Sequence, residues 1–297
     1  MIKILIWLFI ISSITMASTT NQLEIISNEA NATENYNLAI KYYEEGNYSM
    51  SSQLNIKACE KKHFYACRAA GNFYKSDKWI KQNTDKYMYL YEKACEYGDK
   101  KACFELAQEY NNMNNISKAI LFYTKACNGN IYKSCTILGS LYYLGKGVNQ
   151  DYNIAKKFFS KACHGNHMQA CSALAEAYMG TDTQYYSPNK AIKLYKKACE
   201  NNEIKACYNL AIIFHEGKAI KKNYEKAKFF YEIACANKYI LAYRNLANLY
   251  LKGDGTKQNI IRAKGLYKHA CTEGDKESCR MLKKIRVIEM QSPNTLK

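Results

Sequence analysis

The thirteen cysteines are the residues of this chain whose spacing most clearly points to chemistry. Twelve of them form six pairs in which the second cysteine follows the first by eight positions. Structural zinc sites usually take shorter C-x(2 to 4)-C spacings arranged around one ion, so evenly spread C-x7-C pairs favour disulfides. The predicted disulfides are Cys59 with Cys67, Cys95 with Cys103, Cys127 with Cys135, Cys163 with Cys171, Cys199 with Cys207, and Cys271 with Cys279.

The thirteenth cysteine, Cys235, has no partner because position 243, eight residues later, is a tyrosine. Unpaired cysteines commonly behave as small buried apolar side chains, and we expect this of Cys235. An intermolecular disulfide or a reactive thiol is the alternative interpretation.

Two further motifs resemble parts of hydrolytic sites. Ser187 and Lys190 form an S-x-x-K motif, but the S-D-N and K-T-G motifs that accompany it in serine β-lactamases are missing from the sequence. Because Pro188 follows, we expect Ser187 to be a helix N-cap, with the proline in the first helical turn. His164 and His167 form H-x-x-H, which offers at most two metal ligands. The sequence therefore identifies no catalytic residue, no metal site and no cofactor.

The first residues predict export. Lys3 precedes an apolar run from Ile4 to Met16, and the small residue Ala17 follows, which is the pattern of a secretory signal peptide cut after Ala17. An N-terminal membrane anchor is the alternative, but a spanning helix needs about 20 apolar residues. We therefore expect an exported protein, periplasmic or secreted, with no membrane span after cleavage. Disulfides form in such oxidising compartments.

Disulfides at this spacing require the chain to reverse direction between the two cysteines. Residues eight apart on one helix are separated by about 12 Å, whereas bridged cysteines have Cα atoms about 4.4 to 6.8 Å apart. Residues suited to a left-handed conformation follow the first cysteine by two or three positions and would end a helix there. The predicted turn residues are Gly98, Gly129, Gly165, Asn202, Asn237 and Gly274.

The cysteines also mark a repeat. Successive first cysteines, counting Cys235, are separated by 36, 32, 36, 36, 36 and 36 residues, a period typical of stacked helix pairs. An alanine directly precedes each of these seven cysteines. An aromatic residue stands four positions before six of the cysteines and extends the same apolar stripe of one helix. These aromatic residues are Tyr91, Tyr123, Phe159, Tyr195, Tyr231 and Tyr267. The predicted fold class is all-α, an α-solenoid of about seven helix-pair repeats stapled by disulfides.

The repeated phrase carries a family resemblance. A-C-x-x-L-x-x-x-Y-x-x-G-x-G-V followed by D-Y-x-x-A-x-x-F/Y-x-K-A-C, well matched by residues 135–163, resembles the Sel1-like repeat, a relative of the tetratricopeptide repeat. The paired cysteines make it similar to the exported Helicobacter cysteine-rich proteins. Members of that branch have been labelled β-lactamases or penicillin-binding proteins. The resemblance therefore implies β-lactam binding or hydrolysis as an alternative function.

The resemblance covers roughly residues 34–285, with two departures besides the tyrosine at position 243. The G-x-G-V loop is missing between Cys95 and Cys127, and Asn35 stands where the second cysteine of a preceding pair would fall. We expect the first unit to be an N-terminal cap.

The predicted organisation has four parts. Residues 1–17 are a signal peptide, residues 18–33 an N-terminal tail, residues 34–290 a single repeat solenoid, and residues 291–297 a C-terminal tail.

Charge gives a weaker indication of partners. The chain carries a net charge of +17, and because residues 18–60 hold six glutamates against two lysines, the positive charge lies in the repeats that follow. A basic surface could bind acidic glycans or other polyanions, although lysines on the solvated faces of helices explain the same composition. We expect no nucleic-acid partner for an exported chain with no recognition element.

The resemblance also implies where a ligand would bind. In arrays of this family the helices that begin at the second cysteine line the concave side, so residues one, two and five after it would face a groove. Amides and guanidinium groups there could bind a peptide, a protein or a peptidoglycan-derived fragment. The alternative is that these are ordinary polar surface residues of an Asn-rich chain. The candidate groove residues are Arg68, Asn72, Tyr208, Asn209, Arg244, Asn245 and Asn248.

Two asparagines match a bacterial glycosylation pattern. Asn31 in EANAT and Asn47 in EGNYS both follow the acidic-x-Asn-x-Ser/Thr form, and both lie near the N-terminus. We expect them to be accessible to a glycosylating enzyme.

Overall fold

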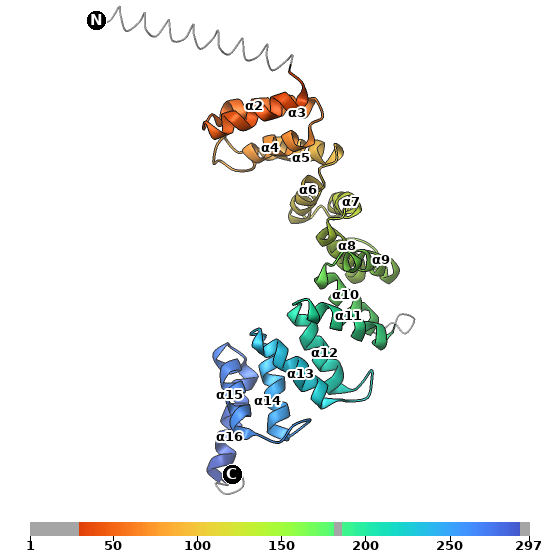
Figure 1. Ribbon diagram of the computed structural model, residues 1–297, viewed down its shortest axis with the longest axis vertical. Coiled ribbons are helices and arrows are strands. Elements are labelled where there is room, and N and C mark those ends of the chain that lie inside the picture. The colour runs from red at the N-terminus through yellow and green to blue at the C-terminus, as the bar shows by residue number, and fades with distance from the viewer. Residues whose placement is uncertain (1–29, 181–185, 292–297) are drawn as a thin grey trace, which may run out of the picture. The chain divides into compact units, whose positions relative to one another are not determined.

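The computed structural model describes residues 30–180 and 186–291, and all regular secondary structure in these two ranges is helical (Figure 1). The predicted signal peptide, residues 1–17, lies outside the described residues. The helices are α2 (Ala32–Glu44), α3 (Tyr48–Glu60), α4 (Phe64–Lys75), α5 (Thr84–Glu96), α6 (Lys100–Asn112), α7 (Ile116–Asn128), α8 (Tyr132–Leu144), α9 (Tyr152–His164), α10 (Met168–Met179), α11 (Pro188–Glu200), α12 (Ile204–Glu216), α13 (Tyr224–Ala236), α14 (Ile240–Lys252), α15 (Ile260–Thr272) and α16 (Lys276–Gln291). The predicted all-α solenoid of helix-pair repeats is confirmed.

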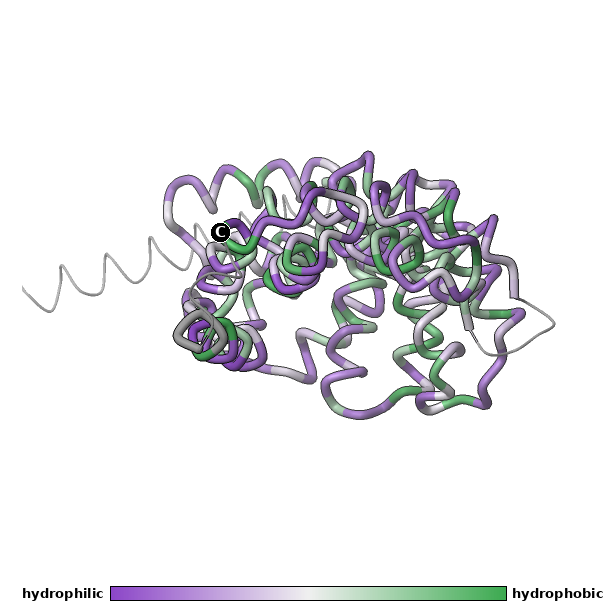
Figure 2. The backbone as a smooth tube through the Cα atoms, turned by 90° about the horizontal axis from the view of Figure 1, so that it is seen from below, coloured by the Kyte–Doolittle hydropathy of each residue, from purple (hydrophilic) through white to green (hydrophobic). Residues whose placement is uncertain are grey.

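The helices alternate between two types, which we call A and B. A helix A ends near the first cysteine of a repeat, and the following helix B carries the second, or Tyr243 in the case of α14. Helices α3, α5, α7, α9, α11, α13 and α15 are of type A, and the even-numbered helices from α4 to α16 are of type B. Helix α2 stands in the place of a preceding helix B. Hydrophobic and hydrophilic residues are interspersed along the helices (Figure 2), as expected for helices with one apolar face.

Most helices A begin at an asparagine or aspartate for a local reason. The side chain of the N-cap residue accepts a hydrogen bond from the backbone N–H three residues later, which has no partner within the helix. The N-cap residues that do so are Asn47, Asn83, Asn115, Asp151, Asn223 and Asn259.

One turn geometry joins helix A to helix B in every repeat. In the first repeat the Lys62 N–H donates to the carbonyl of Cys59 at 2.8 Å, and the His63 N–H donates to the carbonyl of Ala58 at 3.0 Å. These two bonds form a Schellman motif, which requires a left-handed residue at the third position after the cysteine. The left-handed residues are Lys62, Gly98, Asn130, Asn166, Asn202, Lys238 and Gly274.

Three of the predicted turn residues were therefore wrong. Gly129, Gly165 and Asn237 lie two positions after their cysteines and have negative φ angles of −82°, −77° and −96°. The hydrogen-bond pattern fixes the left-handed position at the third residue, so a glycine one position earlier remains right-handed.

The turn explains the spacing of the cysteines. It brings the Cα atoms of residues eight apart to between 4.5 and 4.8 Å, within the range that a disulfide needs. Five pairs with this geometry are Cys59–Cys67, Cys95–Cys103, Cys163–Cys171, Cys199–Cys207 and Cys271–Cys279. Cys127 and Cys135 are disulfide-bonded as well. Each closed loop of nine residues adds about 2.5 kcal/mol in the chain-entropy model.

In the six repeats from α5 onward, the core is the aromatic residue of helix A, which is at most 3 % exposed. It packs against a small residue of the preceding helix B. A Cβ atom added at Gly71 would lie 2.6 Å from the Tyr91 ring, and one added at Gly139 would lie 2.6 Å from the Phe159 ring. A residue without a large side chain is therefore required at this position of helix B, so that the aromatic ring of the next helix A can pack against it.

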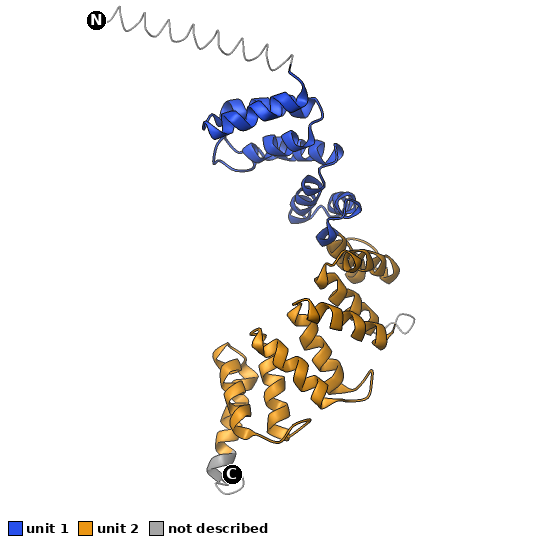
Figure 3. Ribbon diagram, viewed as in Figure 1, with its two compact units in different colours: residues 1–134 blue, residues 135–297 orange. Residues whose placement is uncertain are grey.

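The chain divides into two compact units, residues 1–134 and residues 135–297 (Figure 3). Unit 1 contains α2 to α7, unit 2 contains α9 to α16, and the boundary falls within α8. Of the helices in the described ranges, none is both long and apolar enough to cross a bilayer.

Candidate functional site

The two predicted groove arginines form ion pairs between successive repeats. Arg68 on α4 contacts Asp99, with 2.6 Å between Nε and Oδ2, and Asp99 is only 4 % exposed. The other carboxylate oxygen of Asp99 accepts the backbone N–H groups of Lys101 and Ala102 and so caps α6. Arg244 contacts Asp275 at 2.9 Å in the equivalent position of unit 2. These arginines therefore join neighbouring repeats.

The predicted groove asparagines contact the buried tyrosines of helices A. The Tyr91 hydroxyl lies 2.6 Å from Asn72 Oδ1 and 3.0 Å from Glu105. In unit 2, the Tyr267 hydroxyl donates to Asn248 Oδ1. Burial raises the pKa of Tyr267 to about 12, so its hydroxyl keeps its proton at neutral pH.

The remaining predicted groove residues lie together in unit 2. Asn245 donates from Nδ2 to the Tyr208 hydroxyl at 3.2 Å, and Asn209 hydrogen-bonds Tyr195. The Tyr208 ring also lies 4.9 Å from the Tyr239 ring. All seven predicted groove residues thus have a partner inside the chain, and their role in ligand binding stays a prediction.

The S-x-x-K motif lies at the start of α11. Ser187 is the N-cap residue, as predicted, although its side chain makes no capping hydrogen bond. The ammonium group of Lys190 lies 5.5 Å from the centre of the Tyr178 ring. The structure thus gives Lys190 a cation–π contact with the preceding helix B.

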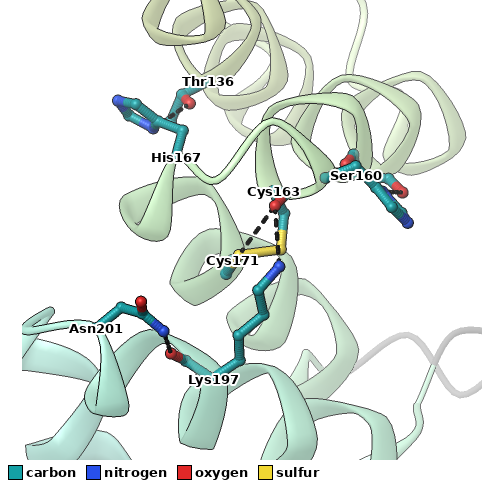
Figure 4. Close-up of a disulfide and its surroundings, with 8 residues drawn as sticks. Thr136, Ser160, Cys163, His167, Cys171, Lys197 and Asn201 are labelled. Atoms are coloured by element: carbon teal, nitrogen blue, oxygen red, sulfur yellow. Dashed lines mark hydrogen bonds between the residues drawn. A yellow bond between two sulfur atoms is a disulfide. The ribbon is translucent and has the colours of Figure 1, made fainter.

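The two histidines of the H-x-x-H motif contact different partners, and Figure 4 shows His167 beside Thr136 in the surroundings of the Cys163–Cys171 disulfide. His164 Nδ1 lies 2.7 Å from the carbonyl of Ser160, and His167 Nδ1 lies 3.0 Å from the hydroxyl of Thr136. Within residues 30–180 and 186–291, no group of three His, Cys, Asp or Glu side chains could hold a metal ion.

Cys235 is a buried free thiol. Tyr243 replaces the second cysteine of this repeat, and its hydroxyl donates to the carbonyl of Cys235 at 2.7 Å. Burial, aided by the negative charge of Glu232, raises the pKa of the Cys235 thiol to about 12. Little thiolate forms at neutral pH, so the environment is that of an unreactive thiol.

Both predicted glycosylation sites are helix N-caps. Asn31 forms a capping box with Glu34 at the start of α2, and Asn47 accepts the N–H of Met50 at the start of α3. Their glycosylation stays a prediction.

An apolar groove in unit 2 was not predicted from the sequence. It lies between α11 and α13, with α12 as its floor, and its volume is about 720 Å³. Phe229 lines it and is 57 % exposed, so part of an apolar surface in this groove is open to solvent. The lining residues are Ile192, Lys196, Cys199, Glu200, Leu210, Phe214, Glu225, Lys226, Phe229, Phe230 and Ile233.

A smaller cavity in unit 1, of about 230 Å³, was also missed. It is open to solvent between α2, α3 and α4, and the loop residue Trp79 covers one side. Asn55 lines it from α3. The sequence did carry a signal for it, because Asn55 stands four residues before Cys59, where the other repeats have an aromatic residue.

A family model for the Sel1 repeat matches the chain seven times. The matched residues are 30–47, 65–99, 100–131, 133–167, 169–203, 204–239 and 240–275. A comparison with curated proteins returned no match.

Two solved structures, with TM-scores of 0.60 and 0.50, show the same fold. A Sel1 repeat protein from Oxalobacter formigenes is 23% identical over 80% of this chain and 96% of that chain, with a TM-score of 0.60. A protective antigen of uropathogenic Escherichia coli is 20% identical over 89% of this chain and 66% of that chain, with a TM-score of 0.50. Cysteine-rich protein B of Helicobacter pylori is 27% identical over 45% of this chain and 96% of that chain, with a TM-score of 0.36.

Proposed function

The chain belongs to the Sel1 repeat family, and because Sel1 repeats typically mediate protein interactions, we propose that it is an exported scaffold that binds a segment of another polypeptide. The exposed Phe229 in the groove between α11 and α13 is the observation that carries this proposal. Large apolar side chains left open to water in a groove mark binding surfaces, because covering them releases hydration water.

The composition of the groove favours a polypeptide over the other predicted partners. Its floor is apolar, and its rim carries two lysines and two glutamates, Lys196, Glu200, Glu225 and Lys226. A polyanion such as an acidic glycan would need a rim of one sign. Mixed charges around an apolar centre suit a peptide that buries apolar side chains and pairs charges of both signs at its edges.

Export is part of the same proposal. Twelve disulfide-bonded cysteines among the described residues support an oxidising compartment, the periplasm or the exterior of the cell. The predicted signal peptide would be removed after Ala17, so the exported protein would begin at Ser18. Intact mass measured on protein secreted by a Gram-negative host tests the cleavage position, and a mass that retains residues 1–17 would contradict it.

Selection from a random peptide display library tests the binding proposal. We expect peptides enriched on the oxidised full chain to bind at least tenfold more weakly to the Phe229→Glu variant, because a charge in the groove blocks apolar burial. Ile261→Glu is the matched control, since Ile261 is an 86 % exposed apolar residue elsewhere in unit 2. A library that yields no peptide sensitive to Phe229→Glu contradicts the groove as the binding site.

A further inference from the structure

One position in the first repeat departs from the pattern that builds the core of all the others. In the six later repeats the residue four positions before the first cysteine is a buried tyrosine or phenylalanine. In α3 this residue is Asn55, four positions before Cys59, and it is also buried, at 4 % exposure. A short amide therefore occupies a place that is built elsewhere to hold an aromatic ring.

The cavity in unit 1 is the space that such a ring would fill. Ala39 on α2 occupies the same offset in its helix as Gly71 on α4, the small residue against which the Tyr91 ring packs. Ala39 and Asn55 both line the cavity. We call this cavity the Asn55 slot, and it is lined by Tyr36, Ala39, Ile40, Tyr43, Ser51, Asn55, Ala69, Asn72, Phe73 and Trp79.

Asn55, which lines the slot, carries a hydrogen-bond acceptor without a partner. The amide nitrogen of Asn55 donates to the carbonyl of Ser51 at 3.0 Å, but the Asn55 Oδ1 atom is buried and accepts no hydrogen bond. A buried acceptor in this state costs about 1 to 3 kcal/mol, which a ligand bearing a donor would recover. The slot thus favours an occupant with an N–H or O–H group at its inner end.

Aromatic rings form the wall of the slot. The Trp79 ring lies 5.9 Å from the Tyr43 ring and 5.8 Å from the Phe73 ring, both in edge-on contacts. Tyr43 itself is 43 % exposed. Such walls favour a flat aromatic occupant, which can stack on one ring and meet the edge of another.

We propose that the Asn55 slot binds the phenol side chain of a tyrosine presented by a partner polypeptide, with the phenol hydroxyl donating to Asn55 Oδ1. Residues 18–29, the segment that precedes α2, contain no aromatic residue and cannot supply the ring. The inference rests on the proposed polypeptide-binding function but concerns a separate site in unit 1, so either site can fail without the other.

Two small probes test the chemistry on the oxidised full chain. N-acetyltyrosinamide carries the phenol, and N-acetylphenylalaninamide has the same ring without the donor. Binding is followed through the indole N–H resonance of Trp79, identified by its loss in the Trp79→Phe variant. We expect the tyrosine probe to bind about fivefold more tightly than the phenylalanine probe, because it forms one additional hydrogen bond. Binding of neither probe, or equal binding of both, overturns the proposal.

Variants of the slot supply the structural test. Asn55→Tyr rebuilds the aromatic residue of the other repeats and should weaken binding of the tyrosine probe at least tenfold. Gln53→Tyr is its control, because it places the same ring at an exposed position of α3 and should leave binding unchanged. Asn55→Ala keeps the space but removes the acceptor, so the two probes should bind equally. Probe binding that survives Asn55→Tyr, or a tyrosine preference that survives Asn55→Ala, contradicts the slot.

The Phe229→Glu variant separates the two proposals. Probe binding to the slot should be unchanged in this variant, whereas peptides selected on the groove should lose affinity. Loss of probe binding in Phe229→Glu would place the probe in the groove and overturn the slot.

Discussion

Replacing Tyr243 with cysteine should add a disulfide to the one repeat that lacks it. The turn after Cys235 has the same hydrogen bonds as the bridged turns, because the Lys238 N–H donates to the Cys235 carbonyl at 2.9 Å and the Tyr239 N–H donates to the Ala234 carbonyl at 3.0 Å. A cysteine at position 243 would therefore meet Cys235 without movement of the backbone. We expect the bridge to form during oxidative production.

The expected gain follows from three contributions. Closing a loop of nine residues raises the free energy of unfolding by about 2.5 kcal/mol in the chain-entropy model. Removing the Tyr243 hydroxyl, which bonds the Cys235 carbonyl, lowers it by about 1 kcal/mol. Loss of the ring contact between Tyr243 and His269, whose centres are 4.3 Å apart, lowers it by about 0.5 kcal/mol. The net expectation is a stabilisation of about 1 kcal/mol.

Tyr243→Ser is the matched control, because serine has the size of cysteine and cannot form a bridge. Urea unfolding of the oxidised proteins should place Tyr243→Cys about 2.5 kcal/mol above Tyr243→Ser. Thiol titration after denaturation should find one free thiol in the parent protein and none in the cysteine variant. Two free thiols in that variant, or equal stability of the two variants, would refute the shared turn geometry.

Three further predictions concern single contacts. Alkylation of Cys235 at mildly alkaline pH should be slow and limited by unfolding, since burial raises its thiol pKa to about 12; complete labelling within minutes, seen by mass spectrometry, would contradict this. Because the pKa of Tyr267 is about 12 in the fold and about 10 in the unfolded chain, the unfolded state loses its proton first and stability should fall as pH rises from 10 to 12. The decline of the urea midpoint should be shallower in Tyr267→Phe, and equal slopes would argue against this burial. Asp99→Ala should lower the free energy of unfolding by about 2 kcal/mol, more than Arg68→Ala does, because Asp99 is buried and also caps α6. Equal losses in urea unfolding would show that only the ion pair contributes.

The predictions that followed from local spacing were accurate. The all-α class and the helix–turn–helix between paired cysteines depend on residues less than ten positions apart, and backbone geometry leaves few alternatives at that range. The errors at Gly129, Gly165 and Asn237 arose because residue preference was read without the hydrogen-bond pattern that decides which position is left-handed.

Contacts between repeats could not be read in the same way. Arg68 and Arg244 have side chains suited to a ligand, yet each contacts a carboxylate 31 positions later. The groove around Phe229 depends on residues of three helices, from Ile192 to Ile233, whose joint surface forms only when the helices pack. The vacant place beside Asn55 was visible as a missing aromatic in the repeat pattern, but its meaning required the cavity.

The sequence by itself determined the period, because the paired cysteines recur at a regular spacing. It also determined the place of each chain reversal and the disulfide pairing, because these depend on the geometry of a single turn between two helices. The tertiary structure decided which side chains are occupied by neighbouring repeats and which remain open to solvent. That division depends on distances between residues of different repeats, and it assigns Arg68 to a structural ion pair while leaving Phe229 and Asn55 with unfilled space beside them.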